Sequence, residues 1–143
     1  MNIPEKAISV RQPWAWAIIH ARKGIENRPV NWKLRGPVAI HASQSMGVLE
    51  YQKARDFMLS IGVEDIPRPD ELKRGTIIGA VDVTDCINDS EDPWFFGPYG
   101  LVVKNPRPIE MNTLVSGQLG AFKWDPTSLA LPEPSPWMKN WCQ

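Results

Sequence analysis

Three charged residues of mixed sign lie close together in the pattern Lys23-x-x-Glu26-x-Arg28. The segment 25–28 is predicted to be extended, and alternate side chains of an extended segment project to the same face. Glu26 and Arg28 would then share a face, which Lys23 reaches from the preceding corner. A compact group of this kind is either a structural salt-bridge network or a binding or catalytic site. The sequence leaves both interpretations open.

The N-terminal third of the chain is basic, although 16 Lys+Arg and 16 Asp+Glu give the whole chain a formal net charge of +0. Between positions 11 and 35 the one acid is Glu26, and the basic residues are Arg11, Arg22, Lys23, Arg28, Lys33 and Arg35. Trp14, Trp16 and Trp32 are interleaved with them. Such a segment suits a phosphate backbone and stacked bases, or forms a solvated basic surface over a tryptophan-rich core. The balanced charge excludes a histone-like binder, so any nucleic-acid contact must come from a local patch.

Other chemical motifs are missing from the sequence. The two histidines, His20 and His41, have no second ligand at a recognised metal-binding spacing, and HExxH and CxxC do not occur. The phosphate-binding patterns GxxxxGK[ST] and GxGxxG and the nucleophile elbow GxSxG do not occur either. We therefore expect no metal and no cofactor.

The elements that must position these residues are short, because 14 of the 143 residues are proline. Apolar and β-branched runs predict strands at 6–10, 25–28, 38–42, 75–84, 101–103 and 119–124. Helices are expected from Pro13 to Gly24 and from Ser43 or Ser45 to about Ser60, the second ended by Gly62. Residues 63–74 and 85–93 are expected to be connections, with a short helix at 137–141. This pattern predicts the α+β class, with a small β-barrel and flanking helices.

The length predicts a single domain over 1–143, with a core at about 6–125 and a proline-rich C-terminal tail at about 126–143. Two cysteines, Cys86 and Cys142, favour a reducing, cytoplasmic setting. The sequence shows no apolar run of signal-peptide or membrane-span length, so neither export nor a membrane partner is expected. A monomer is the favoured state.

Two segments resemble the signature of the ASCH superfamily, whose domains are similar to the PUA fold of RNA-modifying proteins. They are Ile8–Ala15, which contains Gln-Pro-Trp, and Arg22–Arg28, which contains K-x-x-E-x-R. Ala21 stands where the family usually has glycine. Less specific matches follow at Gly36–Ser43, Gly75–Gly79, Phe96–Gly100 and Asn105–Arg107. The resemblance spans about 6–125 and is that of a larger bacterial-type member.

The resemblance implies a PUA-like barrel with a cleft between the barrel and its helices. It implies Lys23, Glu26 and Arg28 on the floor of that cleft and RNA or a nucleoside-like small molecule as the ligand. The candidate walls are Gln12, Trp14 and His41, and the candidate stacking lid is Trp94, Phe96 and Tyr99. The alternatives are a hydrogen-bonded core histidine at position 41 and simple packing of a proline-rich loop at 94–99.

Two enzymatic hypotheses stand beside binding. Some small ASCH proteins are acetylcytidine amidohydrolases that use a Lys, a Thr three residues later and a distant Glu. By this resemblance Lys23 takes the Lys position and Glu26 the Thr position, so Glu26 is a candidate general base and Lys23 a candidate oxyanion stabiliser. We expect Lys23 to be charged, since Glu26 opposes the effect of Arg22 and Arg28 on its pKa. The third hypothesis is a metal-independent ribonuclease with His41 and Lys23 as its acid–base pair.

Overall fold

Residues 2–142 are described by a computed structural model. Its strands are β1 (Lys6–Val10), β2 (Ile25–Arg28), β3 (Gly36–Ala42), β4 (Thr76–Ile87), β5 (Tyr99–Pro108), β6 (Thr113–Val115), β7 (Ala121–Lys123) and β8 (Pro126–Ala130). Its helices are α1 (Trp14–His20), α2 (Val48–Ser60), the short 3₁₀ helix η1 (Pro69–Glu71) and α3 (Pro136–Lys139).

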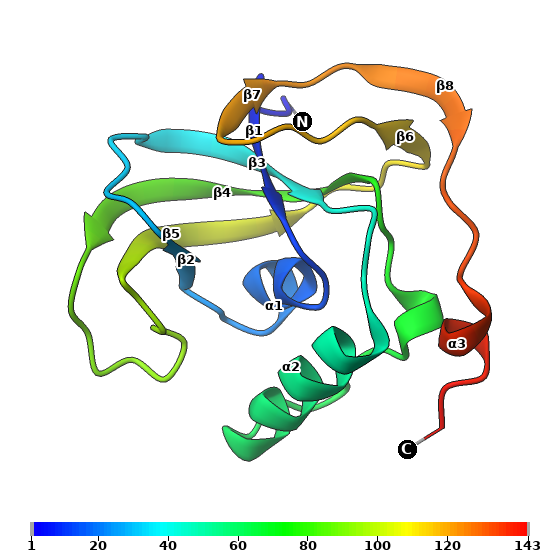
Figure 1. Ribbon diagram of the computed structural model, residues 1–143. Helices are drawn as coiled ribbons and strands as arrows, with labels where there is room; N and C mark the ends of the chain where they lie inside the picture. The colour runs from blue at the N-terminus through cyan, green and yellow to red at the C-terminus, as the bar shows by residue number, and fades with distance from the viewer. Residues whose placement is uncertain (1, 143) are drawn as a thin grey trace.

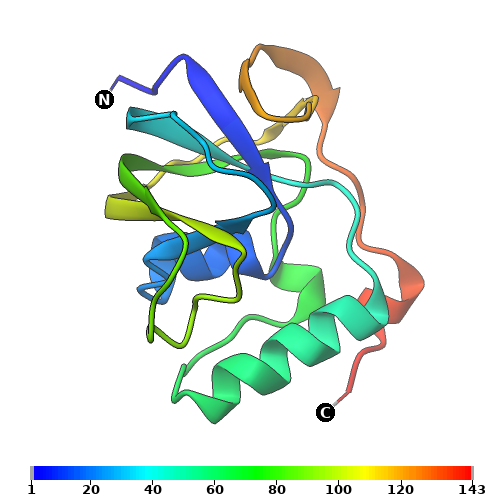
Figure 2. The same cartoon turned by 60° about the vertical axis from the view of Figure 1, so that its left-hand side comes forward.

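Six strands form one sheet in the order β2-β5-β4-β3-β1-β7, and β6 and β8 form a separate ribbon. Within the sheet β1 and β3 are parallel, and the other pairs are antiparallel. The sheet curls into a half-barrel around α1, and α2 lies beyond α1 as a further layer (Figures 1 and 2). The predicted α+β class with a PUA-like barrel and flanking helices is thus confirmed.

The core fills the inside of the curled sheet because β1, β3 and α1 are rich in apolar side chains. Ile8, Ile40 and Leu101 from three strands pack in one cluster with Ile18 of α1, and all four are almost fully buried. A second cluster joins α1 to α2 through Ala17, Met58 and their neighbours. Burial of these side chains holds α1 between the sheet and α2.

The strands predicted at 6–10 and 25–28 are found at those bounds, but α1 is shorter than predicted. It ends at His20 instead of continuing to Gly24, because Arg22 takes a left-handed conformation with φ 59°. The amide of Lys23 then closes the turn on the carbonyl of Ala17, at 3.1 Å. This turn sends the chain directly into β2.

The start of α2 also differs from the prediction. The helix begins at Val48 rather than after Ser43 or Ser45. The carboxylate of Glu50 accepts a hydrogen bond from the Gly47 amide at 3.1 Å and so satisfies a donor at the helix start. As predicted, the chain leaves this helix at Gly62, which has φ +90°.

Two strands are longer than predicted. β4 extends through Ile87, so the start of the connection predicted at 85–93 is strand. β5 runs from Tyr99 to Pro108 and so extends beyond both ends of the strand predicted at 101–103. The two strands pair along most of their length, and the register shift between Ala80 and Asp82 accommodates Asn105 at φ 52°. Long-range pairing therefore outweighs the local turn signals of asparagine and proline.

The predicted C-terminal tail contains ordered elements. β8 pairs with β6, and α3 covers the start of α2 (Figure 1). Met138 of α3 is buried in a cluster with Tyr51, Met46 and Leu72. The short helix expected at 137–141 therefore exists, shifted by one residue at its start. None of the helices in residues 2–142 is long and apolar enough to cross a membrane.

Candidate functional site

The edge strand β2 presents Glu26 and Arg28 to the inside of the half-barrel. In the antiparallel ladder Glu26 is opposite Leu101, and Arg28 is opposite Tyr99. Paired residues project to the same face, and Leu101 on that face belongs to the core. The charged side chains therefore lie on the inner face of the sheet at its β2 edge, beside the apolar core. We call this open side the mouth of the half-barrel.

The predicted charge group is found in the structure. The carboxylate of Glu26 lies between two cations, with Oε1 3.4 Å from Lys23 Nζ and Oε2 3.1 Å from Arg28 Nη2. Lys23 Nζ also donates to the carbonyl of Ile25. The side chains of Lys23 and Glu26 are only 2% and 12% exposed. Few water molecules reach these charges, so each charge is stabilised mainly by its partner within the protein.

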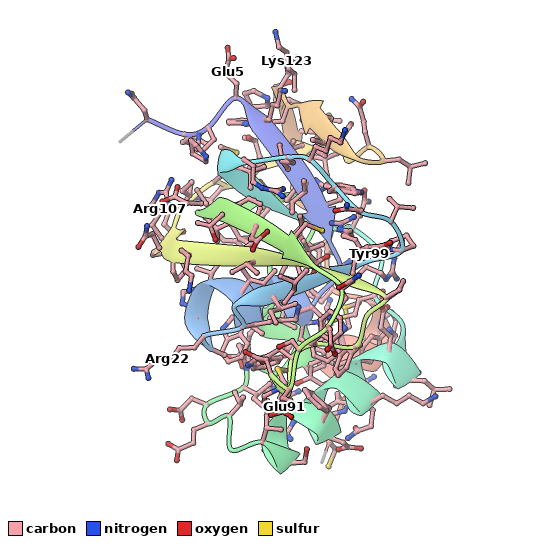
Figure 3. The ribbon with its side chains drawn as sticks, turned by 90° about the vertical axis from the view of Figure 1, so that its left-hand side faces the viewer. Glu5, Arg22, Glu91, Tyr99, Arg107 and Lys123 are labelled. Carbon is pink, nitrogen blue, oxygen red and sulfur yellow. The ribbon has the colours of Figure 1, made fainter. Side chains whose placement is uncertain are left out.

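Burial lowers the pKa of Lys23, and this effect exceeds the opposing effect of Glu26, which raises it. Arg28 lowers this pKa further, and Asp92 raises it. Arg22, expected from the sequence to lower it as well, points away from the molecule (Figure 3). The sequence argument considered only neighbouring charges and missed burial, which is the largest influence.

The guanidinium of Arg28 connects β2 to β1 across the mouth. Its Nη2 donates to the carbonyl of Ser9 at 3.0 Å, and the group stacks on the ring of Trp32 with 4.7 Å to the centroid. Its Nε is buried and has no hydrogen-bond partner within residues 2–142. A buried donor without a partner is unusual in a folded protein, and it leaves Arg28 with unused hydrogen-bonding capacity.

A cleft of about 320 Å³ opens above this group. Its lining carries three cations and two carboxylates, and it consists of Ser9, Val10, Arg11, Trp14, Lys23, Glu26, Asn27, Arg28, Glu50 and Phe96. Arg11 and Glu50 form a bidentate ion pair at the rim. The cleft joins side chains from β1, α1, β2 and α2, which are distant in sequence.

The aromatic wall of the cleft is formed by Trp14 and Phe96. The two rings are 5.8 Å apart in an edge-on arrangement, and Phe57 packs against both, 5.0 Å from Phe96 and 6.0 Å from Trp14. Phe96 is 55% exposed, whereas Trp94 is 6% exposed and packs beneath, among the side chains that join α1 to α2. Of the three predicted lid residues, Phe96 is the one that lines this cleft.

Asn27 holds the loop that carries Phe96. Its Nδ2 donates to the carbonyl of Trp94 at 2.9 Å, and its Oδ1 accepts from the amides of Phe96 and Gly97 at 2.8 and 3.1 Å. The loop 94–97 is thus attached to β2 by three hydrogen bonds from one side chain. Sequence reasoning did not single out Asn27, because these partners are about 70 residues away.

The other predicted site residues lie outside this cleft. Gln12 is buried and bonds the carbonyl of Lys73 and the amide of Trp16, on the side of α1 that faces the connection 63–74. Tyr99 is the ladder partner of Arg28 and lies at the opposite end of β5 from Arg107 (Figure 3). It is half-buried, but the cleft lining does not include it.

His41 lines a neighbouring hollow rather than the cleft. Its Nε2 donates to the carbonyl of Val115 at 2.6 Å, and its Nδ1 then accepts from Ser9 Oγ at 2.9 Å. Burial lowers the pKa of His41, and the bond to Val115 opposes this effect. The structure places His41 and Lys23 in different hollows, so the proposed acid–base pair is not adjacent.

Arg11, Glu50 and Asn27 line the cleft although sequence reasoning did not propose them as ligand-binding residues. Arg11 had a signal, since it precedes Gln12-Pro13-Trp14 within the basic segment. No sequence signal pointed to Glu50, because it belongs to α2, which is distant in sequence from the rest of the cleft. Within residues 2–142 no group of three or more His, Cys, Asp or Glu side chains is arranged to hold a metal ion.

The sequence matches the ASCH domain family over residues 8–96, which is more than half of the chain. It is also similar to activating signal cointegrator 1 from Homo sapiens, with 24% identity over 127 residues. That alignment covers 82% of this chain and 22% of the human protein, so the chain spans about a fifth of that relative. The matched segment 8–96 contains Lys23, Glu26, Arg28 and the ring of Phe96. This chain therefore belongs to the ASCH domain family.

Proposed function

We propose that this protein binds a nucleobase in the cleft above Lys23, Glu26 and Arg28, supplied either by a free nucleoside or by an unpaired nucleotide of RNA. The observation that carries the proposal is the pairing of a buried, mixed-charge floor with an exposed aromatic ring. Base edges offer hydrogen-bond donors and acceptors side by side. Unstacked bases are also recognised by aromatic side chains.

The charges of the cleft favour a base over a polyphosphate. Three cations face two carboxylates, and both oxygens of Glu26 are engaged with Lys23 and Arg28. The excess positive charge is therefore small, and it suits a neutral ring or a single phosphate.

The size and the wall of the cleft agree with a single base. Its volume of about 320 Å³ is at the lower end of the roughly 300–1,000 Å³ of small-molecule sites. Phe96 is held by Asn27 and by its neighbouring rings, so stacking a base on it costs little conformational entropy. One stacked base contributes about 1–3 kcal/mol in single-strand binding sites.

Hydrolysis of an acetylated nucleoside is the second candidate, and the burial of Lys23 favours it. In such a reaction Glu26 would take a proton from the attacking water, and Lys23 would donate to the carbonyl oxygen that becomes negative. Glu26 would then return that proton to the leaving amino nitrogen as the amide carbon–nitrogen bond breaks, releasing acetate and cytidine. A buried lysine beside a carboxylate is an arrangement found in catalytic sites and in structural ion pairs.

Binding is tested by following tryptophan fluorescence and calorimetry with cytidine, N4-acetylcytidine, the other nucleosides and short single-stranded RNA. Arg28→Ala should weaken binding about tenfold or more, whereas the matched variant Arg107→Ala, at the far end of β5, should leave it unchanged. A stronger dependence on salt for RNA than for nucleosides would identify RNA as the source of the base. Equal affinities of the wild type and Arg28→Ala would overturn the assignment of this cleft.

The hydrolytic candidate is tested by incubating the protein with N4-acetylcytidine and measuring cytidine by chromatography. Lys23→Met and Glu26→Gln retain most of the side-chain volume and should each abolish turnover if the mechanism is right. Binding without cytidine release in the wild type would leave the protein a binding module and exclude this hydrolysis.

A further inference from the structure

A second hollow adjoins the cleft on the other side of Ser9. Its volume is about 360 Å³, similar to the cleft, and Ser9 and Arg11 line both. The carbonyl of Ser9 faces the cleft, where it accepts from Arg28, while its hydroxyl faces the second hollow, where it bonds His41. One residue of β1 therefore forms the ridge between two spaces of similar size.

The second hollow differs from the cleft in chemistry. Arg11 is its one charged lining residue. Besides His41, hydroxyl and amide side chains make up much of the rest: Ser43, Gln44, Ser45 and Gln118. Its floor is the Ser9–His41 hydrogen bond, which is neutral near pH 7 because burial lowers the pKa of His41. Neutral donors and acceptors of this kind suit the edge of a base and the hydroxyls of a ribose.

The loop on the outer side of this hollow is packed closely onto its floor. A Cβ added to Gly117 would come within 2.8 Å of Ser9 Oγ and of His41 Cε1, so only glycine allows this approach. The close approach places Gln118 and Leu119 on the rim. Leu119 is fully exposed there, although it is a large apolar side chain. A flat ring entering the hollow would cover it.

Arg11 lies where the two hollows meet and has donors to spare. A guanidinium has five N–H donors, and Glu50 takes two of them, one from Nε and one from Nη2. No acceptor within residues 2–142 takes the others, and the side chain is 51% exposed. The ion pair with Glu50 fixes the guanidinium in place without using its full capacity, which leaves it able to hold a phosphate oxygen.

We propose that the ligand spans both hollows and is a dinucleotide unit of single-stranded RNA. One base lies in the cleft, the neighbouring nucleoside lies in the second hollow, and Arg11 binds the phosphate that joins them across Ser9. This inference rests on the proposed nucleobase binding and extends it, because it assigns a second subsite and a phosphate-binding residue.

The test compares three kinds of probe by calorimetry: the four ribonucleosides, the dinucleoside monophosphates of the same bases, and dinucleosides joined by an uncharged methylphosphonate. The best dinucleoside monophosphate should bind at least about tenfold tighter than either of its nucleosides. The uncharged linker should remove most of that gain. The logarithm of the binding constant should fall with the logarithm of salt concentration with a slope of about −0.7, the value for one phosphate contact on a single strand.

The double variant Arg11→Met/Glu50→Gln removes the guanidinium without leaving an unpaired carboxylate beside the phosphate. The side-chain amide oxygen that this change puts at position 50 can still accept from the Gly47 amide. This variant should lose the tighter binding of dinucleotides and bind them no better than it binds nucleosides. Gln118→Ala should reduce dinucleotide binding alone, and Arg107→Ala should change neither.

The outcomes separate this inference from the proposed function. Nucleosides that bind through Arg28, with dinucleotides binding no tighter, would overturn the second subsite and leave the cleft assignment intact. A gain that survives the uncharged linker or the double variant would overturn the role of Arg11. Failure of every nucleoside and dinucleotide to bind would overturn both proposals.

Discussion

Two carboxylate–arginine pairs lie on the same sheet at almost the same distance and differ in their surroundings. Glu26 and Arg28 are 3.1 Å apart with side chains 12% and 16% exposed, whereas Asp82 and Arg107 are 3.2 Å apart with side chains about a third exposed. Arg107 lies at the opposite end of β5 from Tyr99, the ladder partner of Arg28 (Figure 3).

The distance between the two charges does not by itself determine how much such a pair contributes to stability. At the exposed pair water screens both charges, so removing one partner costs little. At the cleft pair a third charge, Lys23, is also buried against Glu26. Removing the carboxylate therefore leaves two cations without their counter-charge. Burial should therefore make the cleft pair sensitive to mutation and pH, and should leave the exposed pair insensitive.

The largest expected effect is that of Glu26→Ala. It should lower the free energy of unfolding by about 3–5 kcal/mol, because it leaves Lys23 and Arg28 without their buried counter-charge. Asp82→Ala, the matched change, should cost about 1 kcal/mol or less. Urea denaturation of both variants measures the difference. Similar losses in the two variants would contradict the comparison.

Asn27 and Asn105 extend the comparison to neutral side chains. Asn27→Ala breaks three hydrogen bonds to the loop 94–97 and should cost about 1–3 kcal/mol, since it leaves loop amides without a partner. The side chain of Asn105 donates one hydrogen bond, to Asp82 at 2.9 Å, and Asn105→Gly keeps the left-handed backbone accessible. That variant should lose about 1 kcal/mol or less. Hydrogen exchange at residues 95–97 should accelerate in Asn27→Ala only.

The buried lysine should appear in the pH dependence of stability. Burial lowers the pKa of Lys23 in the folded state, so between that pKa and the unfolded value of about 10.4 the unfolded chain binds more protons. Stability contributed by this residue therefore rises as pH increases through that window, by at most about 1.4 kcal/mol per pH unit.

Lys23→Met should remove this rise, and the exposed Lys104→Met should retain it. Urea midpoints measured from neutral pH to about pH 10.4 test the difference. A wild-type profile that coincides with that of Lys23→Met would show that burial does not shift this group.

The smallest expected effect is that of Arg107→Ala, which should change the free energy of unfolding by about 0–1 kcal/mol and less at high salt. Asn105 and then Arg107 lower the pKa of Asp82, so its stabilisation is present above the unfolded pKa of about 3.9 and is lost as pH falls through the folded value. Urea denaturation at low and at high salt measures the change in the free energy of unfolding. A loss as large as that of Glu26→Ala would mean that burial is not the cause of the difference.

Much of the cleft floor could be predicted from the sequence because its parts are local. Lys23, Glu26 and Arg28 lie on one turn and one short strand, and the alternation of a strand suffices to align them. The walls could not be predicted in this way. Whether Trp94 or Phe96 faces the cleft depends on the hydrogen bonds of Asn27, which involve partners about 70 residues away.

The same division holds for the fold. The bounds of the short strands 6–10 and 25–28 were predicted correctly, because apolar patterning and flanking turn residues determine them within a few positions of the chain. The ends of β4 and β5 were not, because each strand is extended by pairing with the other despite Asn105-Pro106. The tail was expected to be proline-rich with one short helix. Its strand β8 was not predicted, because it forms by pairing with β6, and α3 is held in place by packing against α2.

The sequence by itself determined the class of the fold, the ASCH resemblance and the charge group of the site, because each depends on neighbours within a turn or a strand. Only the tertiary structure decided how deeply Lys23 is buried, which aromatic ring is exposed and that Arg11 lies between two hollows. Those properties arise where β1, β2, α1 and α2 meet, and the free energy of burying a charge depends on what surrounds it in space rather than along the chain.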